Sequence, residues 1–165
     1  MNETDMRLLV LSDSHGDCAS LREAVEAEQP DRIVHLGDHI ADAQALRLIY
    51  PGIPLYCVCG NTDDPFLGKV EELVQVGGFR LLLTHGHRYH VKSGLAFLTA
   101  HARELQADAV LFGHTHRAFL AFDGVQLCNP GSASRRVSAH GAATYGVIEL
   151  KNGALIPRIR LLGSE

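Results

Sequence analysis

The chain has 165 residues, of which 46% are hydrophobic and 21% charged, which fits one globular domain and argues against extended disorder. Its formal net charge is −4 and its basic residues are scattered, so no long nucleic acid is expected as a partner. The sequence has no secretory segment and no apolar run near the ~20 residues of a membrane span. We therefore expect a cytoplasmic protein without membrane attachment, with residues 1–165 as a single domain and 1–6 as a polar N-terminal tail; a homo-oligomer stays open.

The first half of the chain alternates apolar runs with amphipathic segments. Residues 7–12, 32–36 and 55–58 are continuous apolar runs, typical of strands that are buried on both faces. Residues 19–28 and 41–49 place apolar side chains at three- and four-residue steps, which predicts helices. This alternation of strands and helices predicts a parallel sheet.

The second half is richer in hairpins. A hairpin is predicted at 73–84 around Gly77–Gly78, and a helix at 93–105 with Ser93 as its N-cap. Further strands are predicted at 109–112, 117–122, 125–129, 144–150 and 154–161. Two-residue turns at 123–124 and 152–153 join the last four of these into hairpins. The economical layout is α/β, with two mixed sheets packed face to face and helices outside.

Metal-competent side chains follow five of these predicted strands. They are Asp13, His15, Asp38, Asn61, His85, His114 and His116. Because the carboxyl ends of strands in an open α/β sheet form one ligand-binding edge, we expect these side chains to converge. In extended segments, residues i and i+2 point the same way, so two histidines or an aspartate and a histidine two apart can face one ligand. Any one of them alone could equally be a capping group or a structural histidine.

The ligand types indicate the kind of metal. Imidazole and carboxylate together suit first-row ions such as Mn²⁺, Ni²⁺, Co²⁺, Fe²⁺ or Zn²⁺. Seven ligands exceed the needs of one such ion but fit two divalent ions that share a bridge, and Asp38 is the natural bridging carboxylate. With Asp13 and Asp38 contributing two negative charges, a pair of dications keeps enough positive charge to bind a hydroxide and a phosphodiester.

The ordered motifs resemble the calcineurin-like metallophosphoesterase superfamily. The motifs are Asp13-x-His15, Gly37-Asp38, Gly60-Asn61, His85 and Gly113-His114-x-His116. The runs Thr84-His85-Gly86-His87 and Asn129-Pro130-Gly131-Ser132 are similar to its small YfcE-type phosphodiesterase branch. The resemblance implies a four-layer α/β/β/α sandwich. It also implies one metal held by Asp13, His15, Asp38 and His116, and a second held by Asp38, Asn61, His85 and His114.

The chain departs from that family pattern at two places. Many members carry a histidine directly after the metal-binding asparagine as a proton donor, and Thr62 stands there. His87 and His39 are the nearest substitutes; for His87, a proton-shuttle role beside the metals and a structural role both stay open. The branch often continues past its Asn-Pro-Gly-Ser run with a Pro-Arg pair, so the sequence leaves open whether Arg135 or Arg136 contacts phosphate.

The sequence therefore predicts a dinuclear phosphodiesterase, with Mn²⁺ as the expected metal and a small phosphate ester as its substrate. In this hypothesis Asp38 positions a metal-bound hydroxide that attacks phosphorus. A phosphomonoesterase or nucleotide pyrophosphatase is the alternative, although Thr62 makes esters with poor leaving groups less suitable. An alternative of another class is a non-catalytic interaction scaffold with the same fold, as in the retromer subunit that it resembles.

Overall fold

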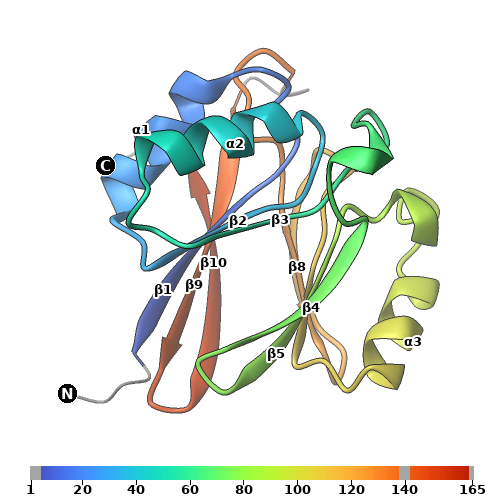
Figure 1. The fold of residues 1–165 in the computed structure, drawn as a ribbon. Coiled ribbons are helices and arrows are strands. Elements are labelled where there is room, and N and C mark those ends of the chain that lie inside the picture. The colour runs from blue at the N-terminus through green and yellow to red at the C-terminus, as the bar shows by residue number, and fades with distance from the viewer. Residues whose placement is uncertain (1–4, 138–141, 164–165) are drawn as a thin grey trace.

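The structure is a computed structural model that describes residues 5–137 and 142–163. It consists of two five-stranded sheets packed face to face, with helices on both outer sides (Figure 1). The predicted four-layer α/β/β/α sandwich is confirmed. Within the described residues, no helix is long and apolar enough to cross a membrane.

The first sheet contains both the first and the last strands of the chain. Its order is β10 (Ala154–Leu161), β9 (Thr144–Lys151), β1 (Met6–Leu11), β2 (Arg32–His35) and β3 (Leu55–Cys57). β1, β2 and β3 run parallel, and β9 and β10 form an antiparallel hairpin beside them. Helices α1 (Cys18–Glu28) and α2 (Ile40–Ile49) connect the parallel strands and cover the outer face of this sheet (Figure 1).

The second sheet is formed by the middle of the chain. Its order is β4 (Glu71–Val76), β5 (Phe79–Thr84), β6 (Ala109–Leu111), β8 (Gln126–Pro130) and β7 (Ala118–Phe122). β5, β6 and β8 run parallel, while β4 and β7 are the antiparallel edges. Helix α3 (Ala96–Glu104) covers its outer face, and short 3₁₀ helices η1 (Pro65–Leu67) and η2 (His87–Tyr89) lie in the loops.

Strand β1 shows why the sandwich has three apolar layers between its outer surfaces. Leu8 and Val10 point into the core between the sheets, whereas Leu9 and Leu11 point outward against α1 and α2. All four side chains are fully buried. This period of two on a strand buried on both faces produces the continuous apolar run in the sequence. A third cluster joins α3 to β5, β6 and β8.

Two predicted boundaries are wrong. Helix α3 begins at Ala96, its N-cap is Leu95, and Ser93 makes no cap. The backbone N–H of Ser93 instead closes a turn on His90, and Gly94 has φ +144°, a conformation that no α-helix contains. Met6, which the sequence placed in the tail, begins β1 opposite Leu150; residues 1–4 of that tail lie outside the described residues.

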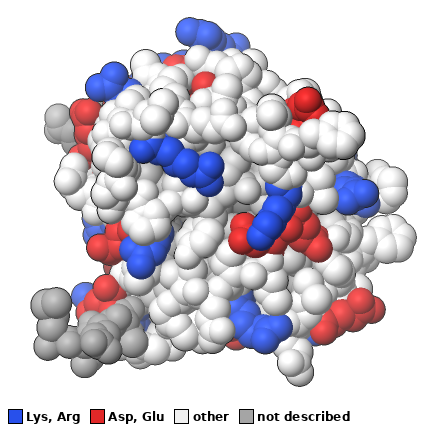
Figure 2. All heavy atoms as spheres, viewed as in Figure 1, with Lys and Arg blue, Asp and Glu red and all other residues white. Residues whose placement is uncertain are grey.

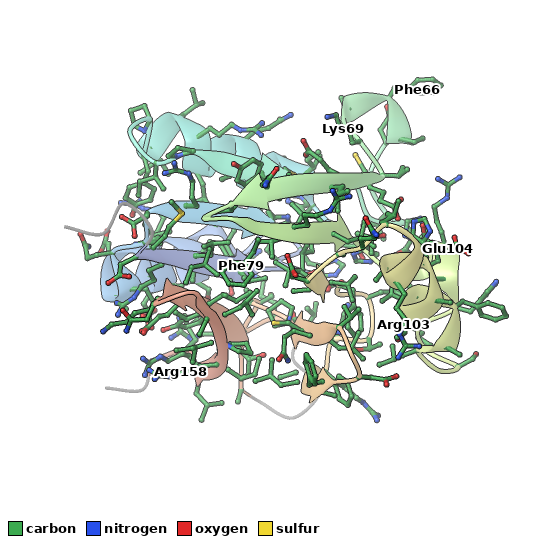
Figure 3. All side chains as sticks on the ribbon, turned by 90° about the horizontal axis from the view of Figure 1, so that it is seen from below. Phe66, Lys69, Phe79, Arg103, Glu104 and Arg158 are labelled. Atoms are coloured by element: carbon green, nitrogen blue, oxygen red, sulfur yellow. The ribbon has the colours of Figure 1, made fainter. Side chains whose placement is uncertain are left out.

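The surface carries mixed charge. In the view of Figure 2, Lys and Arg side chains alternate with Asp and Glu, and no basic stripe crosses this face among the described residues. From below, Phe79 lies between the two sheets, while Phe66 in η1 projects away from the molecule (Figure 3). The side chain of Phe66 is 95% exposed, on the segment that follows the Asn61 loop.

Candidate metal centre

Five predicted ligands meet where the strands of both sheets end. The Oδ1 atom of Asp13 lies 3.1 Å from Nε2 of His116, 3.8 Å from that of His85 and 3.9 Å from that of His15. The Oδ2 atom of Asp38 lies 3.5 Å from Nε2 of His85 and 3.6 Å from that of His15. Asp13 and Asp38 come from the first sheet and His85 and His116 from the second, so the centre bridges the two sheets.

Four of the predicted ligands form one compact group. Donor atoms of Asp13, His15, Asp38 and His116 all lie within 4.8 Å of one another, which fits a single ion. His114 lies outside this group, with its ring 5.1 Å from that of His85. The predicted amide ligand Asn61 is exposed, and the N–H of the next residue, Thr62, donates to Oδ1 of Asp38 at 3.1 Å. Asn61 as a ligand stays a prediction.

Several atoms of the cluster are buried without a hydrogen bond. Among the described residues these include Oδ1 of Asp13 and Nε2 of both His15 and His85. An unsatisfied buried polar atom costs about 1–3 kcal/mol, so three such atoms aimed at one another are unfavourable in the protein alone. A divalent cation satisfies carboxylate and imidazole donors together. The residues present therefore fit a metal centre.

Hydrogen bonds hold the ligands in a form that is ready to bind. Nδ1 of His85 donates to the carbonyl oxygen of Leu36 at 2.8 Å, which keeps the ring proton on Nδ1 and leaves the lone pair of Nε2 free to bind a metal ion. The other oxygen of Asp13, Oδ2, accepts from the hydroxyl of Ser12 at 2.6 Å and from the N–H of His114 at 3.1 Å.

Some members of the cluster have lowered pKa values, so a proton competes less strongly with a metal ion for their side chains. Burial lowers the pKa of His114 to about 4, and the positive charge of Lys92 acts in the same direction. Burial by itself raises the pKa of Asp13, but contacts with His116 and His15 outweigh it and hold that pKa well below its usual range. The contact with Asp13 in turn raises the pKa of His15. At any pH below that raised pKa, a metal ion that binds His15 therefore has to displace a proton.

The loops that carry these ligands have unusual backbone conformations. Five of them adopt the left-handed region: Asp13 (φ 53°), His15 (45°), Asp38 (60°), His114 (73°) and His116 (60°). Such angles are uncommon for residues other than glycine and cost about 1 kcal/mol or more each. The expectation that Asp13 and His15, like His114 and His116, lie in extended segments is therefore wrong. The strand ends turn sharply here, and these turns direct the side chains toward one point.

Two glycines allow the loops to approach one another. A Cβ atom on Gly60 would lie 2.1 Å from Oδ1 of Asp38, and one on Gly113 would lie 2.1 Å from the hydroxyl of Ser12 and 2.7 Å from Oδ2 of Asp13. Contacts under 3.0 Å are not tolerated, so any side chain at either position displaces a carboxylate ligand. Gly113 belongs to the second sheet and Asp13 to the first, so this is also where the sheets meet.

Asp63 organises the first sheet's side of the centre. Its carboxylate accepts hydrogen bonds at 2.8 Å from the backbone N–H groups of Asp38, His39, Ile40 and Gly60. Although burial raises its pKa, these bonds outweigh that effect and lower it. Asp63 therefore fixes the backbone of Asp38, the predicted bridging aspartate, and the start of α2.

His35 connects the two carboxylate loops from below. Its Nδ1 accepts from the N–H of Gly37 at 3.2 Å, so the ring proton lies on Nε2, which donates to the hydroxyl of Ser14 at 2.8 Å. The side chain is fully buried, and burial lowers its pKa to about 4. His35, at the end of strand β2, is thus a buried and hydrogen-bonded neighbour of the candidate site.

The two histidines considered as proton donors differ in position. The ring of His87 lies 5.5 Å from that of His85 and 6.1 Å from that of His114, and burial lowers its pKa. Its Nδ1 is buried with no hydrogen bond among the described residues, so its role stays a prediction. His39 instead contacts Asp42 at 3.0 Å at the start of α2, which is a structural arrangement.

Asp42 supports the candidate centre, and it was not predicted from the sequence. Its Oδ1 contacts His39, and its Oδ2 accepts from the N–H of Gly16 at 2.9 Å, next to His15. Asp42 is buried on a helix that otherwise presents apolar side chains to the sheet. The sequence shows only an acidic residue near the start of the predicted helix 41–49, and the burial that requires it to have partners is known from the structure alone.

The fold and the centre define a class: a two-sheet α/β sandwich with a carboxylate and histidine metal centre at its strand ends. Residues 6–153 match the family model described as the calcineurin-like phosphoesterase superfamily domain, and the chain belongs to this family.

A Bacillus subtilis protein named "Probable metallophosphoesterase YsnB" is 34% identical over 158 residues, which cover 93% of this chain and 89% of that protein. Two solved structures share the fold. A predicted phosphoesterase from Streptococcus pneumoniae superposes with a TM-score of 0.82 at 24% identity, covering 98% of this chain and 92% of the other. Zn²⁺-complexed Vps29 from Entamoeba histolytica gives a TM-score of 0.66 at 19% identity, covering 96% of this chain and all of the other.

Proposed function

We propose that the protein is a dinuclear metal-dependent phosphoesterase that acts preferentially on phosphodiesters. The observation that carries the proposal is the set of buried, unpartnered donor atoms of Asp13, His15 and His85 around a shared centre. When bound, two divalent ions, with Mn²⁺ as the first to test, supply positive charge for a phosphate ester and activate water. Membership of a phosphoesterase family supports the same reaction class.

The chain's own residues would divide the work as follows. Asp13, His15, Asp38 and His116 would hold one ion, and Asp38, Asn61, His85 and His114 the other, with Asp38 common to both. Asp63 and the glycine at 60 keep Asp38 in place.

The chain has no obvious group at residue 62 that could protonate the leaving group. Thr62 is exposed beside Asp38 and has no group that titrates near neutral pH. Esters with good leaving groups need no such proton, which supports activated diesters as substrates. His87, near His85 and His114, is the remaining proton-shuttle candidate.

The first test combines metal binding with turnover of bis-p-nitrophenyl phosphate. We expect two Mn²⁺ ions per chain by calorimetry and metal-dependent release of p-nitrophenol. Asp38→Asn and His114→Ala should reduce turnover by at least about a thousandfold, since both remove a ligand of the charge-stabilising group. Asp123→Asn, in an exposed turn, and His101→Ala, on α3, serve as matched controls and should stay within about twofold of the wild type.

No turnover with Mn²⁺, Ni²⁺, Co²⁺, Fe²⁺ or Zn²⁺ would count against the proposal and favour an interaction scaffold. The diester preference has its own comparison. If p-nitrophenyl phosphate were cleaved with a higher kcat/KM than bis-p-nitrophenyl phosphate, the protein would be a phosphomonoesterase instead.

A further inference from the structure

An apolar cavity of about 280 Å³ lies beside the candidate metal centre. One wall is the loop before α3, with Val91 and Leu95, and the other is the start of β7, with Ala118 and Phe119. Phe112, which is fully buried, lies behind them. None of these side chains belongs to the ligand set, and the apolar lining is not explained by metal binding.

This cavity adjoins the candidate metal centre at Thr115. Thr115 lines the cavity and stands between the predicted ligands His114 and His116. Its hydroxyl accepts a hydrogen bond at 3.0 Å from the side-chain amide of Asn129, which also donates to the carbonyl oxygen of Gly113 at 3.2 Å. The wall that the cavity shares with the centre is therefore held in one position.

Cationic side chains lie on the same side of the centre. A second cavity of about 330 Å³ is lined by Val91, Lys92, Thr115 and Arg117, and so adjoins the first along three shared residues. Among the described residues, neither Lys92 nor Arg117 has a carboxylate partner in an ion pair. Arg117 lines both cavities and Lys92 lines the second, so an anion that places a group in the apolar cavity would have these two positive charges nearby.

We propose that this cavity, which we call the ring pocket (Val91, Leu95, Phe112, Ala118 and Phe119), binds an aromatic group esterified to the phosphate that is cleaved. The inference rests on the proposed phosphoesterase function and adds a substrate class to it: aryl or heteroaryl phosphodiesters. The substrate would extend from the metals, past Lys92 and Arg117, into the ring pocket.

The lining favours a ring over an alkyl chain or a polar sugar. Phe119 offers an exposed aromatic surface, which pairs with another ring in edge-to-face or offset geometry for about 0.5–1.5 kcal/mol beyond burial, and the buried Phe112 closes the back of the pocket. The cavity volume is near the lower end of the ~300–1,000 Å³ typical of small-molecule sites, which suits one ring system. A methyl group would leave most of this space unfilled.

The kinetic test compares two diesters with the same leaving group, phenyl p-nitrophenyl phosphate and methyl p-nitrophenyl phosphate. Phe119→Ala removes a wall of the ring pocket, and Phe122→Ala is its matched control on the same strand, 73% exposed and outside the pocket. We expect Phe119→Ala to lower the phenyl-to-methyl ratio of kcat/KM about tenfold. Phe122→Ala should change it by less than twofold. Ala118→Leu fills the pocket and should lower the same ratio, whereas Ala100→Leu on α3 should not.

A binding measurement separates the pocket from the reaction. Phenylphosphonate and methylphosphonate, which have no ester bond, are titrated into zinc-loaded protein with labelled methyl groups. We expect phenylphosphonate alone to shift the methyl signals of Val91, Leu95 and Ala118. If these shifts occur but no diester is turned over, the result supports the ring pocket and contradicts the proposed activity. If both diesters are cleaved with a ratio that neither pocket variant changes, and no methyl signal shifts, the ring pocket is overturned and the activity stands.

Discussion

Adjacent arginines that look equivalent in the sequence occupy different positions. The guanidinium of Arg135 pairs with both carboxylate oxygens of Glu23, at 2.8 and 3.0 Å. That of Arg136 lies against Gly16, beside His15, and makes no ion pair with any described residue. We therefore expect Arg136 to be the one that contacts the substrate phosphate.

Replacing Arg136 tests this expectation directly. Arg136→Ala should raise KM for a phosphodiester roughly tenfold, because a charge-assisted hydrogen bond to the substrate is lost. Arg135→Ala is the matched control and should leave KM unchanged, since its charge is already paired with Glu23. Steady-state kinetics of both variants decides the question, and an equal rise in KM for the two would refute the assignment.

His35 should make the stability of the protein depend on pH. Burial lowers its pKa to about 4 in the folded protein, against about 6.5 in the unfolded chain. Between pH 6.5 and 4, the unfolded chain therefore binds a proton at His35 that the folded protein does not bind. Stability from this group is complete above pH 6.5 and falls as the pH drops toward 4, by roughly 3 kcal/mol in all.

The measurement is the free energy of unfolding in denaturant at several pH values, with chelator present so that metal binding does not contribute. His35→Gln has no proton to gain, so its stability should fall less steeply than the wild type's between pH 6.5 and 4. Parallel curves for the two proteins in this range would show that His35 does not titrate as its burial indicates.

In the loop after β3, a glycine that has no side chain determines where the carboxylate of Asp38 can lie. A methyl group at residue 60 would collide with Oδ1 of Asp38, so Gly60→Ala should displace this ligand. We expect at least about a tenfold loss of Mn²⁺ affinity in calorimetry, in the range found when supports of metal ligands are removed. Gly52→Ala is the matched control, since a methyl group there meets nothing within 4 Å. Similar losses in both variants would contradict a local effect on Asp38.

The strands and helices were largely predictable because their apolar patterns are strong. A strand buried on both faces, such as β1, produces a continuous apolar run, and α1 and α2 show helical spacing. The start of α3 was not predictable in this way. Ser93 has the chemistry of an N-cap, but the conformation of Gly94 separates it from the helix, and no residue pattern encodes that angle.

Because the centre takes ligands from both sheets, metal binding should stabilise the entire fold. His85, His114 and His116 come from the second sheet and Asp13 and Asp38 from the first, so unfolding either sheet destroys the site. At a hundredfold excess over Kd, an ion that binds only the folded state adds about 2.7 kcal/mol. We expect Mn²⁺ to raise Tm by roughly 5–10 °C. His114→Ala should lose a large part of this shift in a thermal scan, and an undiminished shift would place the metal elsewhere.

The convergence of the ligands was predictable because strand ends collect at one edge, whereas their supports were not. The rule for strand ends identified Asp13, Asp38 and the histidines from their order alone. Asp42 was missed and the full span of Asp63's hydrogen bonds was not foreseen, because each supports the centre by binding backbone N–H groups of distant loops. Such contacts depend on the tertiary arrangement, and sequence spacing does not show them.

The left-handed backbone of the ligand loops has a consequence for how the family can change over time. At Asp13, His15, Asp38, His114 and His116, glycine would relieve torsional strain, so the fold and the chemistry make opposite demands on the same positions. A descendant released from catalysis would gain stability by accepting glycine or asparagine there, and its site would be lost by ordinary drift. In this chain all five positions keep an aspartate or a histidine, so the torsional cost falls on the same residues that would hold the metal.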